Sequence, residues 1–380
     1  MPNATPKRVF YVGSPEIFSK GASAIHIMKM CQAMARLGVR TSLLIPTYRP
    51  TGDMCQYYGV ESNFRIVSFP YFSNTSVRNI AHGIRAAVYA GRRRKDFDLA
   101  VTRNIVFALI ATKILRVPTV YDAHHPLVTG ARILFGAFKR SSKLIRFSAN
   151  SRGLGEIYLR EGLPPEKLVV AHNGVDLQGY MSLPDKARAR ADLGLPPGRE
   201  IVCYSGNIYE GRGIEHLIDI APGMSGVLFL IVGGLESDVQ RCRSLAREKR
   251  AENIRFTSYV HHNTVPLYLA ASDVLVMPYT SRMTIRGGTL AGDFTSPIKL
   301  FEYMASGRPV VAASIPSVSE ILEDGVNAIL VPPDSPEAVA AGIKRALGDP
   351  ALSKAVSERA ASDVRRYTWE ARAKKLLGID

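Results

Sequence analysis

The sequence predicts an α/β protein made of two doubly wound, Rossmann-like domains. Three observations support this fold class: the length of the chain, an alternation of short apolar runs with helical patterns, and a second start of that alternation after a polar segment. The 380 residues exceed what one core usually holds and suit two domains of about 150–200 residues each. Hydrophobic residues make up 46% of the chain, which is enough to fill two cores.

The first half contains six short apolar runs separated by helical patterns. Parallel strands that are covered on both faces have this near-continuous apolar character. The runs lie at residues 8–13, 41–46, 64–69, 98–103, 118–123 and 143–150. A helical pattern follows the first run from Ala22 to Leu37, and Gly38 ends it. We therefore expect a parallel sheet with crossover helices.

The alternation starts again after residues 183–200, a polar segment rich in Pro and Gly that predicts a linker with one short helix. Six further apolar runs lie at residues 200–206, 227–234, 253–259, 273–279, 308–314 and 327–333. We expect an N-terminal domain at residues 1–180 and a second domain at 181–365. In such folds ligands bind at the carboxyl ends of strands and between domains, so we expect the two domains to face each other across a cleft.

The positive charge of the chain is concentrated in its first half. Residues 1–180 hold 25 Lys and Arg against 10 Asp and Glu, whereas residues 181–380 hold 24 against 23. This asymmetry favours an anionic partner: a membrane surface, a phosphate-bearing substrate or a nucleic acid. No nucleic-acid module or aromatic stacking platform is recognisable, so we expect no nucleic-acid partner.

Two basic helical stretches, residues 76–95 and 131–146, mix aliphatic or aromatic side chains with cations. Segments of this kind bind anionic bilayers, but their apolar faces can equally pack on a sheet. No apolar run approaches the ~18 residues of a membrane span, and the N-terminus lacks the pattern of a signal peptide. We expect a cytoplasmic protein, and peripheral association with the inner face of the cytoplasmic membrane is one of the alternatives.

A helix pattern that follows Ser296-Pro297 has the features of an anion site. Ser is a good N-cap and Pro suits the first turn, so the backbone N–H groups of Ile298 and Lys299 should be free at the helix start. Lys299 adds a charge beside them. One turn further on, Glu302 could accept hydrogen bonds from the adjacent hydroxyls of a ribose. An ordinary capped helix is the alternative.

Several stretches, in this order along the chain, resemble glycosyltransferase family 4, the retaining enzymes of GT-B fold. The stretches are KGASAIHIMKMCQAMARLGVRTSLL (20–44), AHNGVD (171–176), YSGNIYEGRGIEHLID (204–219), SDVLVMPY (272–279), residues 295–343 and YTWEARAKKLL (367–377). The resemblance covers nearly the whole chain. It implies that the last segment, residues 366–380, is a helix that crosses back to the N-terminal domain.

The resemblance also implies a donor site and catalytic residues. The donor-binding residues would be Gly21, Gly206, Asn207, Arg212, Tyr259, Val260, Ser296, Ile298, Lys299, Leu300 and Glu302. The catalytic residues would be His124, chosen over its neighbour His125, together with Arg212 and Lys299. Tyr259 and Val260 would contact the base through their backbone. Gly21 would lie near the donor phosphates or the acceptor, or simply form a tight turn.

Two positions depart from the family pattern. The family has two glutamates with seven residues between them; the second falls on Glu302, but the first falls on Phe294, next to Asp293. In the phosphate segment, the family's Gly-Arg is Gly206-Asn207 here, so one positive charge is lost. Lys299 could replace that charge.

The resemblance implies transfer of a sugar from a nucleotide diphosphate sugar, UDP- or GDP-linked, to a glycan or lipid-linked acceptor, with retention and without a metal or other cofactor. Polysaccharide or glycoconjugate synthesis is the expected setting. Asp96-Phe97-Asp98 matches the Asp-x-Asp metal motif of another glycosyltransferase fold, but it precedes an expected strand, where Asp-Leu is a common entry, so we expect no metal there. His261-His262 lacks further ligands at metal spacing. A nucleotide-sugar epimerase of the same architecture and an inactive scaffold remain as alternatives.

Overall fold

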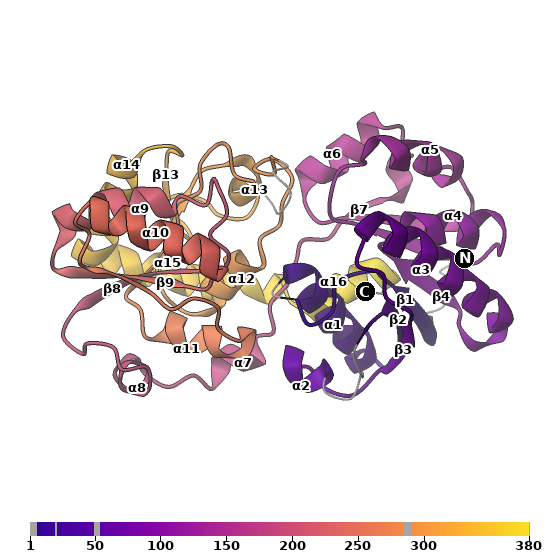
Figure 1. Ribbon diagram of the computed structural model, residues 1–380, viewed down its shortest axis with the longest axis horizontal. Helices are drawn as coiled ribbons and strands as arrows, with labels where there is room; N and C mark the ends of the chain where they lie inside the picture. The colour runs from indigo at the N-terminus through magenta and orange to yellow at the C-terminus, as the bar shows by residue number, and fades with distance from the viewer. Residues whose placement is uncertain (1–5, 20, 49–53, 285–289, 380) are drawn as a thin grey trace. The chain divides into compact units, whose positions relative to one another are not determined.

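The computed structural model describes residues 6–19, 21–48, 54–284 and 290–379 (Figure 1). The chain divides into two compact units, and each is described by itself below. The N-terminal unit contains Met1–Gly174 and Trp369–Asp380, and the C-terminal unit is Val175–Thr368. The first boundary lies six residues before the expected one at 180, and the chain returns to the N-terminal unit at Trp369 rather than at 366.

A seven-stranded, fully parallel sheet forms the centre of the N-terminal unit, in the order β3-β2-β1-β4-β5-β6-β7. The strands are β1 (Arg8–Val12), β2 (Arg40–Pro46), β3 (Arg65–Phe69), β4 (Leu99–Thr102), β5 (Thr119–Ala123), β6 (Leu144–Ala149) and β7 (Leu168–Val170). The six apolar runs predicted as strands are strands. The seventh, β7, was missed because it has only three residues, all half-buried, at the edge of the sheet.

Crossover helices connect these strands. They are α1 (Ala22–Arg36), α2 (Met54–Tyr58), α3 (Thr75–Arg92), α4 (Ile105–Lys113), α5 (Thr129–Phe138) and α6 (Arg152–Arg160). Helix α3 packs on α4 and α4 packs on α5, whereas the last helix, α16 (Trp369–Leu377), packs on α1 (Figure 1, yellow beside indigo). The strand order reverses between β1 and β4, and a doubly wound sheet binds ligands at such a point.

The C-terminal unit repeats this plan with six parallel strands in the order β10-β9-β8-β11-β12-β13. The strands are β8 (Glu200–Ser205), β9 (Val227–Val232), β10 (Ile254–Phe256), β11 (Val274–Met277), β12 (Val310–Ala313) and β13 (Ile329–Val331), all six of them predicted. Its helices are α7 (Gln178–Met181), α8 (Lys186–Asp192), α9 (Ile214–Ile220), α10 (Glu236–Glu248), α11 (Val265–Ala270), α12 (Ile298–Ala305), α13 (Pro316–Ser319), α14 (Pro336–Gly348) and α15 (Pro350–Asp363).

Short 3-10 turns supplement these elements. They are η1 (Arg94–Asp96), η2 (Pro165–Lys167), η3 (Ala221–Met224), η4 (His262–Thr264) and η5 (Val364–Arg366). In the described parts of the chain, no helix combines the length and the apolar character needed to cross a bilayer.

Candidate functional site

The carboxyl ends of β8 and β11 carry a group of aromatic and cationic side chains in the C-terminal unit. The strand order reverses between these two strands, so their carboxyl ends form the ligand-binding point of a doubly wound sheet. Tyr204 lies in β8 and Tyr279 follows β11, and both rings are buried. Neither tyrosine was predicted, although both lie in stretches that the sequence singled out.

Lys299 in the first turn of α12 directs its ammonium group against these rings. Its Nζ lies 3.7 Å from the centroid of Tyr204 and 5.7 Å from that of Tyr279. The Nζ atom is buried and has no hydrogen-bond partner among the described residues. Burial, assisted by Arg212, holds the pKa of Lys299 well below its ordinary value. An unpaired ammonium group in this position favours an anionic ligand, which would supply the missing charge.

Arg212 lies on the other side of this group. Its Cζ is 4.9 Å from the centroid of Tyr279, and its Nη1 donates to Sδ of Met283 at 3.1 Å. Its Nε is buried without a partner in the described structure. Burial alone would lower the pKa of Arg212, but the neighbouring tyrosines, Tyr279 first, outweigh burial and raise it. Within the described residues, neither Arg212 nor Lys299 forms an ion pair with a carboxylate.

Glycine is required where β8 ends, because the backbone at Gly206 has a φ of +120°. A Cβ atom there would lie 2.6 Å from Nζ of Lys299. The following residue, Asn207, is half-buried, and its carbonyl accepts a hydrogen bond from the hydroxyl of Tyr204 at 2.5 Å. The glycine therefore makes the space that Lys299 occupies.

The start of α12 differs in detail from the prediction. Pro297, not Ser296, occupies the N-cap position, and no side chain caps the helix. The N–H of Leu300 donates to the carbonyl of Pro297 at 3.1 Å, which leaves the N–H groups of Ile298 and Lys299 without an acceptor in the described chain. The assignment of Ser296 as the cap was wrong because Pro297 adopts the extended conformation that begins the helix one residue later.

Glu302 is buried one turn further along α12 and is bound by a histidine that the sequence did not indicate. Oε1 of Glu302 lies 2.7 Å from Nε2 of His262. The neighbouring Tyr303 anchors the helix to β8, because its hydroxyl accepts the N–H of Ser205 at 2.7 Å. His262 and Glu302 are 40 residues apart, so no local pattern could have predicted their contact.

The residues predicted to contact the base, and the position expected near the donor sugar, differ in how exposed they are. Tyr259 and Val260 follow β10 and are half-buried, and the ring of Tyr259 packs edge-on against His261. Phe294 is 5% exposed and belongs to the core, whereas the adjacent Asp293 is exposed. The aromatic side chain is therefore used for packing at the position where the family pattern has its first glutamate.

In the N-terminal unit, the carboxylate of Asp122 organises a second buried group at the end of β5. Its Oδ1 accepts from Nη2 of Arg372 at 2.6 Å, and its Oδ2 accepts from the hydroxyl of Tyr11 at 3.0 Å. Burial would raise the pKa of Asp122, but Arg372 and His124 outweigh burial and hold that pKa well below its usual range. Asp122 is therefore ionised and can only accept hydrogen bonds.

His124 is a member of this group. Its Nε2 lies 3.2 Å from Oδ2 of Asp122, which can only accept, and 3.4 Å from Nη2 of Arg372, which can only donate. The shorter contact places the proton on Nε2. Its Nδ1 lies 3.5 Å from Nδ2 of Asn150. Burial, with a further contribution from Arg103, lowers the pKa of His124 to about 3. The ring is therefore neutral and held in one orientation.

A cavity of about 200 Å³ borders His124 and the exposed His125. Ligand atoms of His26, Asp122 and His124 lie within 4.8 Å of one another, which is close enough to hold a metal ion. The guanidinium of Arg372 already neutralises the carboxylate of this trio, so the arrangement suits a fixed hydrogen-bond network better than a cation site.

Gly21 has an unremarkable conformation at the N-cap of α1, with φ of −96°. A Cβ atom there would meet only Oγ of Ser19, at 3.4 Å. Neither backbone conformation nor space therefore requires glycine at this position. Lys20, which begins the resembling stretch, lies outside the described residues.

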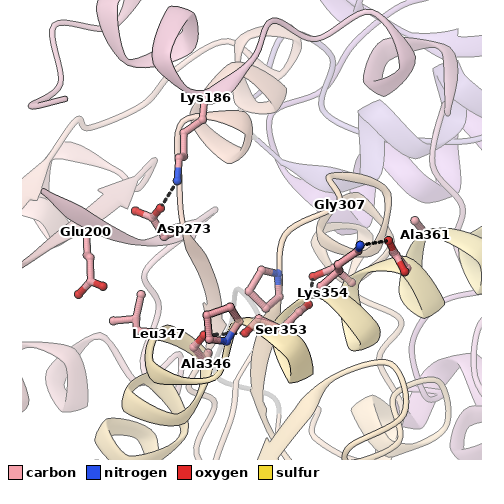
Figure 2. Close-up of a pocket in the computed structure, with 13 residues that line it drawn as sticks. Lys186, Glu200, Asp273, Gly307, Ala346, Leu347, Ser353, Lys354 and Ala361 are labelled. Carbon is pink, nitrogen blue, oxygen red and sulfur yellow. Dashed lines mark hydrogen bonds and ion pairs between the residues drawn. The ribbon is translucent and has the colours of Figure 1, made fainter. Parts of the chain in front are cut away.

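A hollow of about 570 Å³ lies at the opposite edge of the C-terminal sheet (Figure 2). It borders Glu200 at the start of β8 and Asp273 just before β11, so it is at the amino ends of the strands. The charge of Asp273 is neutralised by Lys186, whose Nζ lies 2.6 Å from Oδ1. This hollow is therefore not the ligand site of the sheet.

Two family models match the chain: Glycosyltransferase Family 4 over residues 23–178 and Glycosyl transferases group 1 over residues 199–349. The chain is 27% identical over 318 residues to a D-inositol 3-phosphate glycosyltransferase of Streptomyces bingchenggensis, covering 76% of this chain and 67% of that protein. It is 27% identical over 199 residues to an alpha-D-kanosaminyltransferase of Streptomyces kanamyceticus, covering 51% of this chain and 48% of that one. The chain thus spans about half to two thirds of these relatives.

Solved structures resemble the chain over almost its full length. A crystal structure of Anabaena Alr3699/HepE in complex with UDP and glucose has a TM-score of 0.75 at 18% identity and covers 97% of both chains. A glycosyltransferase from Rickettsia africae has a TM-score of 0.77 at 14% identity, covering 98% of this chain and 97% of that one. At these identities the likeness shows a common fold.

Proposed function

The chain belongs to the family 4 glycosyltransferases and has their GT-B fold, and on this premise we propose that it transfers a sugar from a nucleotide diphosphate sugar to a hydroxyl group of a glycan or lipid-linked acceptor. UDP-sugars are the first donors to test, because the similar Anabaena protein was solved with UDP and glucose, and GDP-sugars are the second. The observation that carries the proposal is a pair of half-buried cations, Lys299 and Arg212, whose Nζ and Nε atoms are buried and that have no carboxylate partner in the described structure.

The donor diphosphate would bind to these cations and to the first N–H groups of α12. A guanidinium binds phosphate oxygens through two donors, and free N–H groups at a helix start add partial positive charge. Gly206 leaves the space in which Nζ of Lys299 lies beside the backbone. These charges would stabilise the leaving diphosphate as the glycosidic bond breaks, and they replace the countercharge that a metal would supply in a metal-dependent enzyme.

Glu302 would accept hydrogen bonds from the two ribose hydroxyls, with His262 holding one carboxylate oxygen in place. We assign the acceptor to the N-terminal unit and place His124 near the acceptor sugar, where its neutral, oriented ring can contact a hydroxyl group. The leaving phosphate would take the acceptor proton, with retention of the anomeric configuration. Polysaccharide or glycoconjugate synthesis at a membrane is the setting we propose.

Nucleotide binding tests the proposal directly. Thermal unfolding is measured with UDP, GDP, ADP, CMP and dTDP, since a ligand that binds only the folded state stabilises it by about 2.7 kcal/mol at a hundredfold excess over Kd. We expect a shift with one nucleoside diphosphate, lost in Arg212→Ala and Glu302→Ala and kept in Lys344→Ala, which removes an exposed cation of the same unit. A shift that survives in Arg212→Ala would contradict the assignment.

Product analysis then separates the alternatives. Release of the nucleotide together with a glycosylated acceptor supports transfer. A changed nucleotide sugar in the absence of acceptor would indicate an epimerase, and nucleotide binding without any turnover of any donor would indicate a scaffold.

A further inference from the structure

Helix α3 of the N-terminal unit has its large aliphatic side chains on its exposed face, whereas a helix that packs on a core usually buries them. Four of them are 46–53% exposed, and we call them the α3 ridge: Val77, Ile80, Ile84 and Val88. Their spacing of three, four and four residues places them on one side of the helix, over about 16 Å. The face that packs inward is made mainly of small residues, among them Gly83, Ala86, Ala87 and Ala90. Core packing therefore does not explain the ridge.

Exposed cations accompany the ridge. Arg85 lies beside it, and four consecutive cations, Arg92 to Lys95, end the helix and enter η1. The only acidic residue between Thr75 and Asp96 is Asp96 itself, which pairs with Arg93 at 3.4 Å. A hollow of about 650 Å³ lies along this side, bordered by Phe69, Ile84 and Val88 together with Arg85, Arg92 and Arg93.

The two basic stretches considered for membrane binding differ in the side chains that they expose. In α5, Phe135 and Phe138 are buried and belong to the core, which is the packing alternative given for residues 131–146, and Ile133 alone of its large apolar residues in the described structure is strongly exposed, at 79%. In α3 the aliphatic residues face outward. Figure 1 shows α3 beside α4, and the two helices pack together.

We propose that the α3 ridge and the cations from Arg85 to Lys95 form a docking surface for an anionic lipid bilayer. The ridge enters the interface between headgroups and acyl chains, and the guanidinium groups contact lipid phosphates. The charge of this surface selects a bilayer over a neutral protein partner, since five exposed cations face a single carboxylate. The inference extends the proposed function by naming the surface at which a lipid-linked acceptor is met.

Sedimentation with vesicles tests this surface without any donor, so its outcome is independent of the donor site. The full-length protein is mixed with phosphatidylglycerol–phosphatidylcholine vesicles and with pure phosphatidylcholine vesicles. We expect binding only to the anionic vesicles and weakening by salt. Each cation contributes about fivefold to partitioning, so Arg92→Gln/Arg93→Gln/Arg94→Gln should reduce binding by about a hundredfold. Ile80→Ser/Ile84→Ser/Val88→Ser should reduce it about tenfold or more.

A matched control removes the same charge from the C-terminal unit: Arg247→Gln/Arg250→Gln/Lys344→Gln, all exposed positions. It should bind vesicles nearly as well as the native protein. Thermal unfolding of all variants should change little, because the substituted cations are exposed and the ridge side chains are about half exposed. Three results would overturn the proposal: no binding of the native protein to anionic vesicles, an equal loss in the control, or native binding by the ridge variant. Self-association that the ridge variant abolishes, without vesicle binding, would overturn it in favour of a second copy of the chain.

Discussion

Arg372 and Asp122 form an ion pair inside the N-terminal unit, with 2.6 Å between Nη2 and Oδ1 and side chains that are 1% and 0% exposed. The two residues are 250 positions apart, one on α16 and the other in β5. The same carboxylate holds His124, so the last helix of the chain supports the histidine that we place near the sugar.

Removing the guanidinium of Arg372 should destabilise the fold, because it leaves the buried carboxylate of Asp122 without its counter-ion. We expect Arg372→Met to lower the free energy of unfolding of the N-terminal unit by about 3–5 kcal/mol, as measured by urea denaturation. Lys375→Met on the exposed side of the same helix is the control and should have a small effect. Combining Arg372→Met with Asp122→Leu should recover part of the loss. An Arg372→Met protein as stable as the native one would show that the pair is not ionised as inferred.

Lys299 should lower the stability of the ligand-free protein and should be necessary for nucleotide binding. Its buried ammonium has no hydrogen-bond partner in the described structure, so an apolar side chain of similar length removes a desolvation cost. We therefore expect Lys299→Met to keep or raise the melting temperature without ligand and to abolish the stabilisation by UDP or GDP. Unchanged stabilisation of the variant by nucleotide would exclude Lys299 from the phosphate site.

Nucleotide binding should depend on pH through the same lysine. Burial and Arg212 lower the pKa of Lys299 in the free protein, and a bound diphosphate would raise it again. The complex therefore takes up a proton that the free protein lacks. Nucleotide affinity should then fall as the pH rises between two limits: the depressed pKa of Lys299 in the free protein and its higher pKa in the complex. Calorimetry in buffers of different ionisation enthalpy should show proton uptake, and Lys299→Met should show less. Proton release on binding would contradict this scheme.

Gly206 and Gly307 provide a matched pair of substitutions. Both have positive φ, so alanine is strained at either position: about 1–2 kcal/mol at Gly307, where φ of +68° is left-handed helical, and more at Gly206, where φ is +120°. Only at Gly206 would the added Cβ meet Lys299, at 2.6 Å, whereas nothing lies within 4 Å at Gly307. We expect Gly206→Ala to weaken nucleotide binding and Gly307→Ala to leave it intact, as measured by calorimetry. Equal affinity of the two variants would argue against the close approach at Gly206.

The strands of both sheets were largely predictable, because a buried parallel strand is a short apolar run in the sequence itself. β7 was the exception: its three half-buried residues carry too little apolar pattern to be recognised. The start of α12 was predicted one residue too early, since both Ser296 and Pro297 are acceptable at a helix start and only the backbone conformation distinguishes them.

The site was predictable only in part. Gly206, Arg212, Lys299 and Glu302 lie in motifs that the sequence displays, and the structure adds the partners of these residues from other elements. His262 reaches Glu302 from η4, and the ring of Tyr279 lies near both Lys299 and Arg212 from the end of β11. Similarly, the sequence could not distinguish α3 from α5 as the exposed apolar helix, because both have basic amphipathic patterns.

The sequence by itself thus determined the α/β class, the two successive sheets and the motifs that contain Gly206, Arg212, Lys299 and Glu302, because these depend on periodicity and on local residue patterns. The tertiary structure alone decided which charges are paired and which are left without a partner. Asp122 pairs with Arg372 from the last helix of the chain, whereas among the described residues Nζ of Lys299 lies against aromatic rings and has no hydrogen-bond partner. The reason is physical. Burial and ion pairing depend on side chains that the fold brings into contact, and residues far apart in the sequence show no local pattern that predicts such a contact.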